Sequence, residues 1–168
     1  GLGTTFPQDQ PVRLGSIGRP MPGVEARITD VHDPTRSLGA DEAGELQIRG
    51  PIVMLGYFGN EAATRDTILA DGWLRTGDIA RQDADGYIHI VDRMKDMILS
   101  GGYNIYPAEL ERVIAAHPAV AMVAVAAVPD EIKGEAPKAW IVPRRDAVVT
   151  ADEIIAHCRA HLAAYKVP

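Results

Sequence analysis

Cysteine is almost absent from this chain, because Cys158 is the single one among 168 residues. One cysteine cannot form an internal disulfide, which excludes the small secreted domains that disulfide frameworks hold together. The longest apolar run, residues 119–128, is also shorter than the roughly 20 residues that a membrane-spanning helix needs. We therefore expect no transmembrane segment, and a reducing, cytoplasmic environment.

Runs of basic residues are missing too. Lys and Arg number 17 against 23 Asp and Glu, which gives a net charge of −6, and no block of consecutive basic residues interrupts the mixture. Such a chain lacks the electrostatic footprint of a nucleic-acid-binding protein. Apolar residues make up 46% of the sequence, which is enough for a core. We expect a globular protein without nucleic-acid partners.

Residues that could bind metals or act as nucleophiles lack the context that such chemistry needs. His157 and His161 are spaced as two ligands on one helical face, but the Glu of a His-Glu-x-x-His zinc motif is missing. Residues 83–86 begin like a calcium loop, yet the glycine comes two positions too early and no bidentate Glu follows. Cys158 falls on the apolar face of a predicted helix without a His partner. We expect no metal site and no catalytic residue among them.

The first half of the sequence has the pattern of a β-rich fold. Apolar and polar residues alternate in several short segments, as they do in half-buried strands. Asp and Gly residues at 83–86 supply a turn between two such segments, and Asn60 is placed to cap a short helix. The expected elements are strands at residues 24–28, 45–49, 73–80 and 87–91 and a helix at residues 61–69.

The second half combines helices with strands. Pro107 opens a helix whose apolar residues recur at helical spacing, and Thr150 with Glu153 forms a capping box at the start of another helix. The run of Val and Ala at residues 119–128 is expected to be a buried strand, followed by a polar loop at residues 129–137 and a second strand at residues 138–142. This half is therefore predicted to be α+β.

The change of pattern places a boundary in the charged segment Asp92–Lys95. We expect two domains, residues 1–92 and residues 93–168, and an α+β fold class for the whole. Just beyond this joint, Gly101 and Gly102 remove side chains from a short loop, which permits positive φ angles or close approach of a ligand. Alone, such a pair is more typical of a tight turn between a strand and a helix.

Four segments carry a resemblance to a known family. Their order and spacing are similar to those of the adenylate-forming superfamily, which includes acyl- and aryl-CoA ligases, luciferases and the adenylation domains of peptide synthetases. The resemblance covers residues 12–168. It implies a C-terminal portion of such an enzyme: part of the β-barrel subdomain of the large domain, then the small mobile domain. The segments are Gly15–Val24, Gly44-Glu45-Leu46 running to Gly56-Tyr57, Trp73–Asp78 with its Thr76-Gly77-Asp78 motif, and Asp92–Pro107.

The resemblance implies a nucleotide site near the end of the first domain. Asp78 would accept hydrogen bonds from both ribose hydroxyls of ATP or AMP, for which a carboxylate is a strong acceptor. Arg93 would contact the same ribose and steady the domain junction, and Ile90 would pack beside the nucleoside. Without the resemblance, the alternatives are that Asp78 is a strand-end aspartate, that Arg93 forms a surface ion pair and that Ile90 is an ordinary core residue.

The resemblance also implies a CoA site that forms after a domain rotation. Lys95 stands at the family's hinge, where the backbone absorbs the rotation of the small domain between two half-reactions. Gly101 and Gly102 would then border the tunnel for the pantetheine arm of CoA, and Lys133 and Gly134 would lie beside it. A loop lysine in water and plain surface turns are the alternatives. The implied cofactors are ATP or AMP, CoA and Mg²⁺.

Several parts that the family needs fall outside this sequence. The phosphate-binding loop, the Glu that holds Mg²⁺, the acyl pocket and the catalytic lysine have no counterpart here. Lys166 matches a solvent-side residue of a Tyr-Lys-x-Pro motif and receives no catalytic role. We expect the chain to be inactive alone, with the remainder of a parent chain and three small molecules, ATP, a carboxylic acid and CoA, as partners.

For the parent protein, the motifs favour an acyl-CoA ligase that acts on medium- or long-chain fatty acids. Asn104 stands where peptide-synthetase domains carry an arginine, which favours the ligases. An aryl-CoA ligase and a peptide-synthetase adenylation domain are the alternatives within the family. Outside it, the alternative is a non-catalytic α+β interaction module, which would bind no nucleotide in any form of the protein.

Overall fold

The chain forms two compact units, Gly1–Met94 and Lys95–Pro168, in a computed structural model that describes residues 3–7 and 12–168. The division falls after Met94, inside the charged segment Asp92–Lys95, where the predicted boundary follows Asp92. Each unit has its own sheet and its own cluster of buried apolar side chains.

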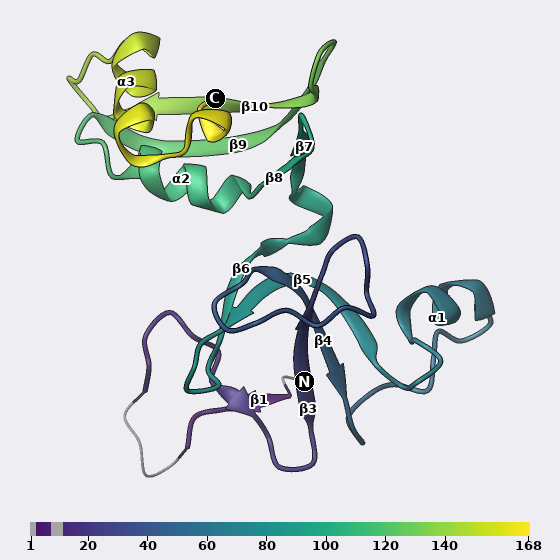
Figure 1. Cartoon of the computed structure of the whole chain (residues 1–168). Helices are drawn as coiled ribbons and strands as arrows, with labels where there is room; N and C mark the ends of the chain where they lie inside the picture. Colours follow the sequence, from purple (N-terminus) through teal and green to yellow (C-terminus); the bar gives the residue numbers. More distant parts are fainter. Residues whose placement is uncertain (1–2, 8–11) are drawn as a thin grey trace. The chain divides into compact units, whose positions relative to one another are not determined.

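The first unit is built on a four-stranded antiparallel sheet of order β3-β4-β5-β6 (Figure 1). Alternating apolar side chains from these strands meet in a core that contains Ile28, Leu46, Ala80 and Ile88. The predicted helix cap is confirmed, because the side chain of Asn60 accepts the N–H of Ala63 at 3.0 Å. The elements are β1 (Thr4–Thr5), β2 (Arg19–Pro20), β3 (Glu25–Thr29), β4 (Gly44–Arg49), α1 (Glu61–Thr67), β5 (Leu74–Gln82) and β6 (Ile88–Arg93).

Asp83 is the anchor of the turn between β5 and β6. Its carboxylate lies 3.0 Å from Nε2 of His89 and 2.7 Å from a guanidinium nitrogen of Arg13, and it accepts the N–H of Tyr87 at 2.9 Å. The hydrogen bond with His89, followed by those from Tyr87 and Arg13, holds the pKa of Asp83 well below its ordinary value. The predicted hairpin turn at residues 83–86 is confirmed, and it is tied to neighbouring strands and to the segment around Arg13.

These contacts make the stability of the fold depend on pH. A carboxylate whose pKa is lower in the folded state stabilises the fold above its unfolded pKa of about 3.9, and this contribution is lost as the pH falls below that value. Asp83→Asn is expected to lower the melting temperature at pH 7 by roughly several degrees and to flatten the loss of stability below about pH 4. Thermal melts of both forms between pH 7 and pH 2 test this, and parallel pH profiles would contradict it.

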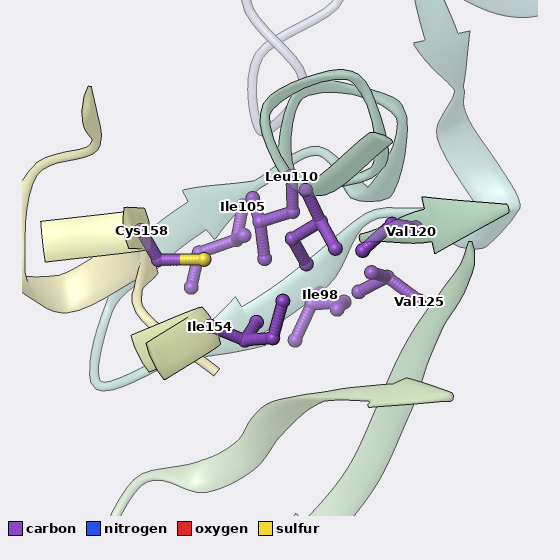
Figure 2. Packing of buried hydrophobic residues seen from close by; sticks show 8 residues of the cluster. Ile98, Ile105, Leu110, Val120, Val125, Ile154 and Cys158 are labelled. Atoms are coloured by element: carbon purple, nitrogen blue, oxygen red, sulfur yellow. The ribbon is translucent and has the colours of Figure 1, made fainter. Parts of the chain in front are cut away.

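The second unit has a four-stranded antiparallel sheet of order β8-β7-β10-β9, with two helices packed on one face (Figure 1). Figure 2 shows side chains from both helices and from β7, β8 and β9 converging, with Leu110 from one helix and Ile154 and Cys158 from the other. No helix within the described ranges is long and apolar enough to cross a membrane. The elements are the 3₁₀ turn Met94–Asp96, β7 (Ile98–Ser100), β8 (Tyr103–Ile105), α2 (Pro107–Ala115), β9 (Val120–Asp130), β10 (Gly134–Pro143), α3 (Ala151–His161) and the 3₁₀ turn Ala164–Lys166.

Both predicted helix starts in this unit are confirmed. Pro107 occupies the first turn of α2, and the side chains of Thr150 and Glu153 form a reciprocal capping box at the start of α3. Such boxes satisfy two backbone N–H groups that would otherwise lack partners.

Three predictions for the second unit are wrong in detail. The segment around Gly101 and Gly102 is the turn of a β-hairpin, β7–β8, and does not lead directly from a strand to a helix. The predicted polar loop at residues 129–137 is mostly strand, because the β9–β10 ladder continues to Asp130 and Gly134. Within β9 only Val120 and Val125 are buried, because helices cover one face of the sheet and β9 is its edge strand.

Candidate functional site

An enlarged bulge in β5 lies at the centre of the first unit's candidate site. Across β4 and β5, Gln47 pairs with Arg75 and Glu45 pairs with Ile79, so the three residues Thr76–Asp78 lie opposite a single residue of β4. Bulges of this kind locally twist a strand and change the direction of its side chains, and they are frequent next to active sites. The predicted Thr-Gly-Asp motif is this bulge.

Asp78 and Arg93 lie directly opposite each other across β5 and β6. Nε of Arg93 is 3.0 Å from Oδ1 of Asp78, and the side chains are 62% and 28% exposed, respectively. The ladder shifts by one residue beside this pair and leaves Val91 as an extra residue of β6. The structure thus brings the two predicted nucleotide ligands together as an accessible ion pair between two bulges.

Ile90 shares a face of the sheet with this pair. It lies opposite Ala80, and Ala80 is two residues from Asp78, so strand alternation directs Ile90 and Asp78 to the same side. Ile90 is 42% exposed, so it is not buried in the core of this unit. The nucleotide-binding roles of Ile90, Asp78 and Arg93 stay predictions.

Lys95 lies in the middle of the 3₁₀ turn Met94–Asp96, where the two units join. Its side chain is exposed, and the turn contains no buried residue. Little packing within the turn therefore opposes a change in its φ and ψ angles. This local structure suits a hinge, and the hinge role stays a prediction.

The two turns that carry Gly101, Gly102, Lys133 and Gly134 lie side by side in the second unit. The N–H of Gly101 donates to the carbonyl oxygen of Lys133 at 2.9 Å. Gly134 pairs with Ser100 in the ladder between β10 and β7. The structure therefore brings together all four residues that the sequence predicts for CoA binding, although the turns are far apart in the sequence.

The glycines of these turns have backbone conformations that favour glycine. The φ angles of Gly101, Gly102 and Gly134 are +56°, +84° and +81°, a region that residues with a Cβ rarely adopt. A Cβ at Gly102 would have no atom within 4 Å. Backbone conformation, and not crowding within the unit, accounts for glycine at this position, and the space beside it is open.

Two acidic residues to which the sequence assigned no role brace these sites. Asp130 accepts the N–H groups of Ile132 and Lys133 at 2.9 and 2.8 Å, and these bonds hold its pKa below the ordinary value. An Asp before a turn is a recognisable signal for this arrangement. Glu45 is 1% exposed, and its Oε2 lies 2.9 Å from Nε of Arg75. No local pattern marks a strand glutamate as buried, because the pairing partner is remote in sequence.

Lys166 is not the solvent-side residue that the sequence predicts. Its Nζ lies 2.6 and 2.8 Å from the two carboxylate oxygens of Glu109, and its side chain is only 17% exposed. The neighbouring Tyr165 stacks on Tyr103 with ring centroids 4.3 Å apart. The ion pair and the stack attach the last 3₁₀ turn to α2 and to β8, so Lys166 has a structural contact.

Cys158 and the histidines of α3 show no catalytic arrangement among the described residues. Cys158 is fully buried, and burial raises the pKa of its thiol, which disfavours the reactive thiolate. The rings of His157 and His161 lie 4.6 Å apart, and Nε2 of His157 is 2.9 Å from the carbonyl oxygen of Val113. Within residues 3–7 and 12–168, no group of three or more His, Cys, Asp or Glu residues could hold a metal ion.

Two family models match the chain: AMP-binding enzyme over residues 1–58 and AMP-binding enzyme C-terminal domain over residues 109–168. A long-chain-fatty-acid–CoA ligase of Yersinia pestis is 48% identical over 167 residues, which are 99% of this chain and 29% of the relative. A feruloyl-CoA synthase of an Amycolatopsis species is 45% identical over 156 residues, 93% of this chain and 31% of the relative. The chain thus spans less than a third of the length of these relatives.

Solved structures agree with this relationship. The crystal structure of ATP-bound MatB from Rhodopseudomonas palustris matches 99% of this chain and 33% of its own, with 34% identity and a TM-score of 0.91. The crystal structure of apo MatB matches with the same coverage and identity and a TM-score of 0.68. The predicted α+β fold class and the predicted resemblance are both confirmed. The chain belongs to the adenylate-forming, AMP-binding enzyme family and corresponds to a C-terminal portion of such an enzyme.

Proposed function

We propose that the chain is part of an acyl-CoA ligase that works in two half-reactions. In the first, a carboxylate oxygen of the acid attacks the α-phosphorus of ATP, pyrophosphate leaves, and an acyl-adenylate forms. In the second, the thiolate of CoA attacks the acyl carbon, AMP leaves, and a thioester forms. Family membership supports this chemistry, and the relative from Yersinia pestis is named for the activity.

The accessible Asp78–Arg93 pair is the observation that carries the proposal. A ribose offers two adjacent hydroxyl donors, and an ionised carboxylate can accept about four hydrogen bonds. Asp78 contacts Arg93 through Oδ1, so acceptor capacity remains for both hydroxyls. Charged acceptors bind hydroxyl groups more strongly than neutral ones. In this proposal Arg93 holds the carboxylate in place and donates to the same ribose, and Ile90 supplies an apolar surface beside it.

A second conformation would account for the glycine turns of the second unit. We propose that rotation about Lys95 presents Gly101 and Gly102 to the bound adenylate, so that the pantetheine arm passes over backbone that carries no side chains. Lys133 and Gly134 would border the same passage. MatB supports such a change, because its ATP-bound and apo structures match this chain with different TM-scores at equal coverage.

An exposed apolar segment supports packing of this chain against further protein. Leu55 and Phe58 are fully exposed, and Ile52 and Tyr57 are 45% and 48% exposed. Soluble proteins rarely leave such a cluster uncovered unless it forms an interface. In this proposal the rest of the parent chain covers residues 51–59 and also supplies the phosphate-binding loop, the Mg²⁺ ligand, the acyl pocket and the catalytic lysine.

Long-chain fatty acids are the proposed acyl substrates, with aromatic acids as the second candidate. The first is supported by the name of the Yersinia pestis relative, and the second by that of the Amycolatopsis feruloyl-CoA synthase, whose identity is only slightly lower. Adenylate formation by the full-length enzyme with palmitate and with ferulate, measured in parallel, distinguishes the two classes.

Asp78→Asn tests the nucleotide site in the full-length enzyme. The substitution keeps the size of the side chain and removes its charge, so ATP affinity is expected to fall roughly 10- to 150-fold, equivalent to about 1.5–3 kcal/mol for hydrogen bonds to a charged group. Binding of ATP measured by calorimetry gives the result directly.

Asp66→Asn is the matched control, because Asp66 is exposed on α1 of the same unit. We expect it to bind ATP as the unmodified enzyme does. Unchanged ATP affinity in a folded Asp78→Asn enzyme would remove Asp78 from the site. Absence of any nucleotide binding by the unmodified full-length protein would favour the non-catalytic interaction module instead.

A further inference from the structure

The bulge that contains Asp78 interrupts the regular pairing of β4 with β5. A regular antiparallel ladder pairs one residue of a strand with one residue of its neighbour. Leu46 instead faces the three residues Thr76–Asp78. The hydroxyl of Thr76 donates to the carbonyl oxygen of Leu46 at 2.7 Å, so a side chain of β5 bonds the backbone of β4 within this irregular stretch.

The same hydroxyl also fixes the last residue of the bulge. The N–H of Asp78 donates to Oγ1 of Thr76 at 3.1 Å. One oxygen atom therefore joins β4, the start of the bulge and the backbone of Asp78. Between them, Gly77 has a φ angle of +72°, and a Cβ there would have no atom within 4 Å. The positive φ angle alone therefore favours glycine, and it lets the chain turn back within the bulge.

A partly buried ion pair holds the strand immediately before the bulge. Nε of Arg75 lies 2.9 Å from Oε2 of Glu45, whose side chain is 2% exposed. Because β4 supplies both this carboxylate and the carbonyl that Thr76 bonds, the position of the bulge is defined on two consecutive residues of β4. Asp78 then reaches Arg93 across the next ladder.

From this geometry we infer that Thr76 is a positioning residue for nucleotide recognition. Its hydroxyl keeps the bulge open and thereby sets the direction in which the carboxylate of Asp78 points. The inference rests on the proposed role of Asp78 as the ribose ligand. Thr76 itself touches no reacting atom, and it acts through Asp78. Serine supplies the same hydroxyl, whereas valine has the shape of threonine but offers neither donor nor acceptor.

The test compares Thr76→Val with Thr76→Ser in the full-length enzyme. For Thr76→Val, the KM for ATP in adenylate formation is expected to rise about tenfold, because the substitution removes two hydrogen bonds that hold the bulge. The KM for the carboxylic acid and the rate of CoA transfer from preformed adenylate should change less than twofold. Thr76→Ser should restore the KM for ATP to within about twofold of the unmodified enzyme. A general loss of packing would change all of these quantities together, and serine would not rescue it.

A double substitution separates this inference from the proposed function. If Thr76 acts through Asp78, Thr76→Val combined with Asp78→Asn should bind ATP no more weakly than Asp78→Asn alone. If the two substitutions weaken ATP binding by factors that multiply in the double variant, the positioning role is wrong. A folded Thr76→Val enzyme with an unchanged KM for ATP would also overturn it. If Asp78→Asn alone has no effect, the nucleotide assignment itself is wrong. Thr76→Ala, which places no methyl group at the hydroxyl position, replaces the valine variant should that one fail to fold.

Discussion

A full-length enzyme with Gly102→Leu is expected to form acyl-adenylate within about twofold of the unmodified rate and to transfer the acyl group to CoA at least about 100-fold more slowly. The reason lies in the open space beside Gly102, where a Cβ would have no atom within 4 Å. If the pantetheine arm uses this space after the rotation, an isobutyl group there would occupy it. A 100-fold effect corresponds to about 2.7 kcal/mol of transition-state stabilisation. Stopped-flow measurement of the two half-reactions separates them.

Gly102→Ala is the matched control for this substitution. Both variants place a Cβ on a backbone with a φ angle of +84°, so both carry the same strain, and only leucine adds bulk. The alanine variant should therefore show a similar decrease in melting temperature and a much smaller decrease in CoA transfer. Equal losses in the two variants would indicate backbone strain. A folded leucine variant with unimpaired CoA transfer would show that Gly102 is only a turn glycine.

Local patterns predicted the elements whose stabilising contacts are local. The cap of α1 by Asn60, the capping box of Thr150 with Glu153 and the proline at the start of α2 each involve residues within one helical turn. The hairpin between β5 and β6 follows from alternation and a turn of Asp and Gly. These elements needed no information from distant parts of the chain.

Elements that depend on distant partners were predicted less well. The β7–β8 hairpin is very short, and β7 joins the sheet through the pairing of Ser100 with Gly134. The Ala- and Val-rich run of β9 resembles a strand buried on both faces, but its alternate side chains, such as Met122, are exposed. Which faces of a sheet helices will cover is a property of the tertiary fold, and small apolar residues tolerate either environment.

In the candidate site, too, local features could be predicted and contacts between remote residues could not. Asp78 and Arg93 could be proposed from their motifs, because each motif is contiguous. Their direct contact across β5 and β6 depends on two register shifts, and a register shift leaves no local mark in sequence. The role of Thr76 follows only once Leu46 is seen opposite the bulge, which no contiguous pattern could reveal.

Lys95→Pro is expected to slow CoA transfer about 100-fold or more while adenylate formation stays within a few-fold of the unmodified enzyme. Proline fixes φ near −65°, a value that a 3₁₀ turn accepts, and Lys95 lies in the 3₁₀ turn between the units. A backbone that must adopt two conformations in one catalytic cycle would then be restricted to one of them. Rapid-quench measurement of each half-reaction gives the two rates.

Lys95→Ala separates the backbone of this residue from its side chain. Alanine leaves φ and ψ free and removes the ammonium group, so both half-reactions should keep nearly unmodified rates if the backbone alone serves the rotation. A loss with alanine as large as that with proline would assign the role to the exposed side chain. Equal impairment of both half-reactions by proline, in an enzyme with an unchanged melting temperature, would mean that the rotation does not pass through Lys95. Selective loss with proline alone identifies the 3₁₀ turn as the point where the chain changes conformation between adenylation and thioester formation.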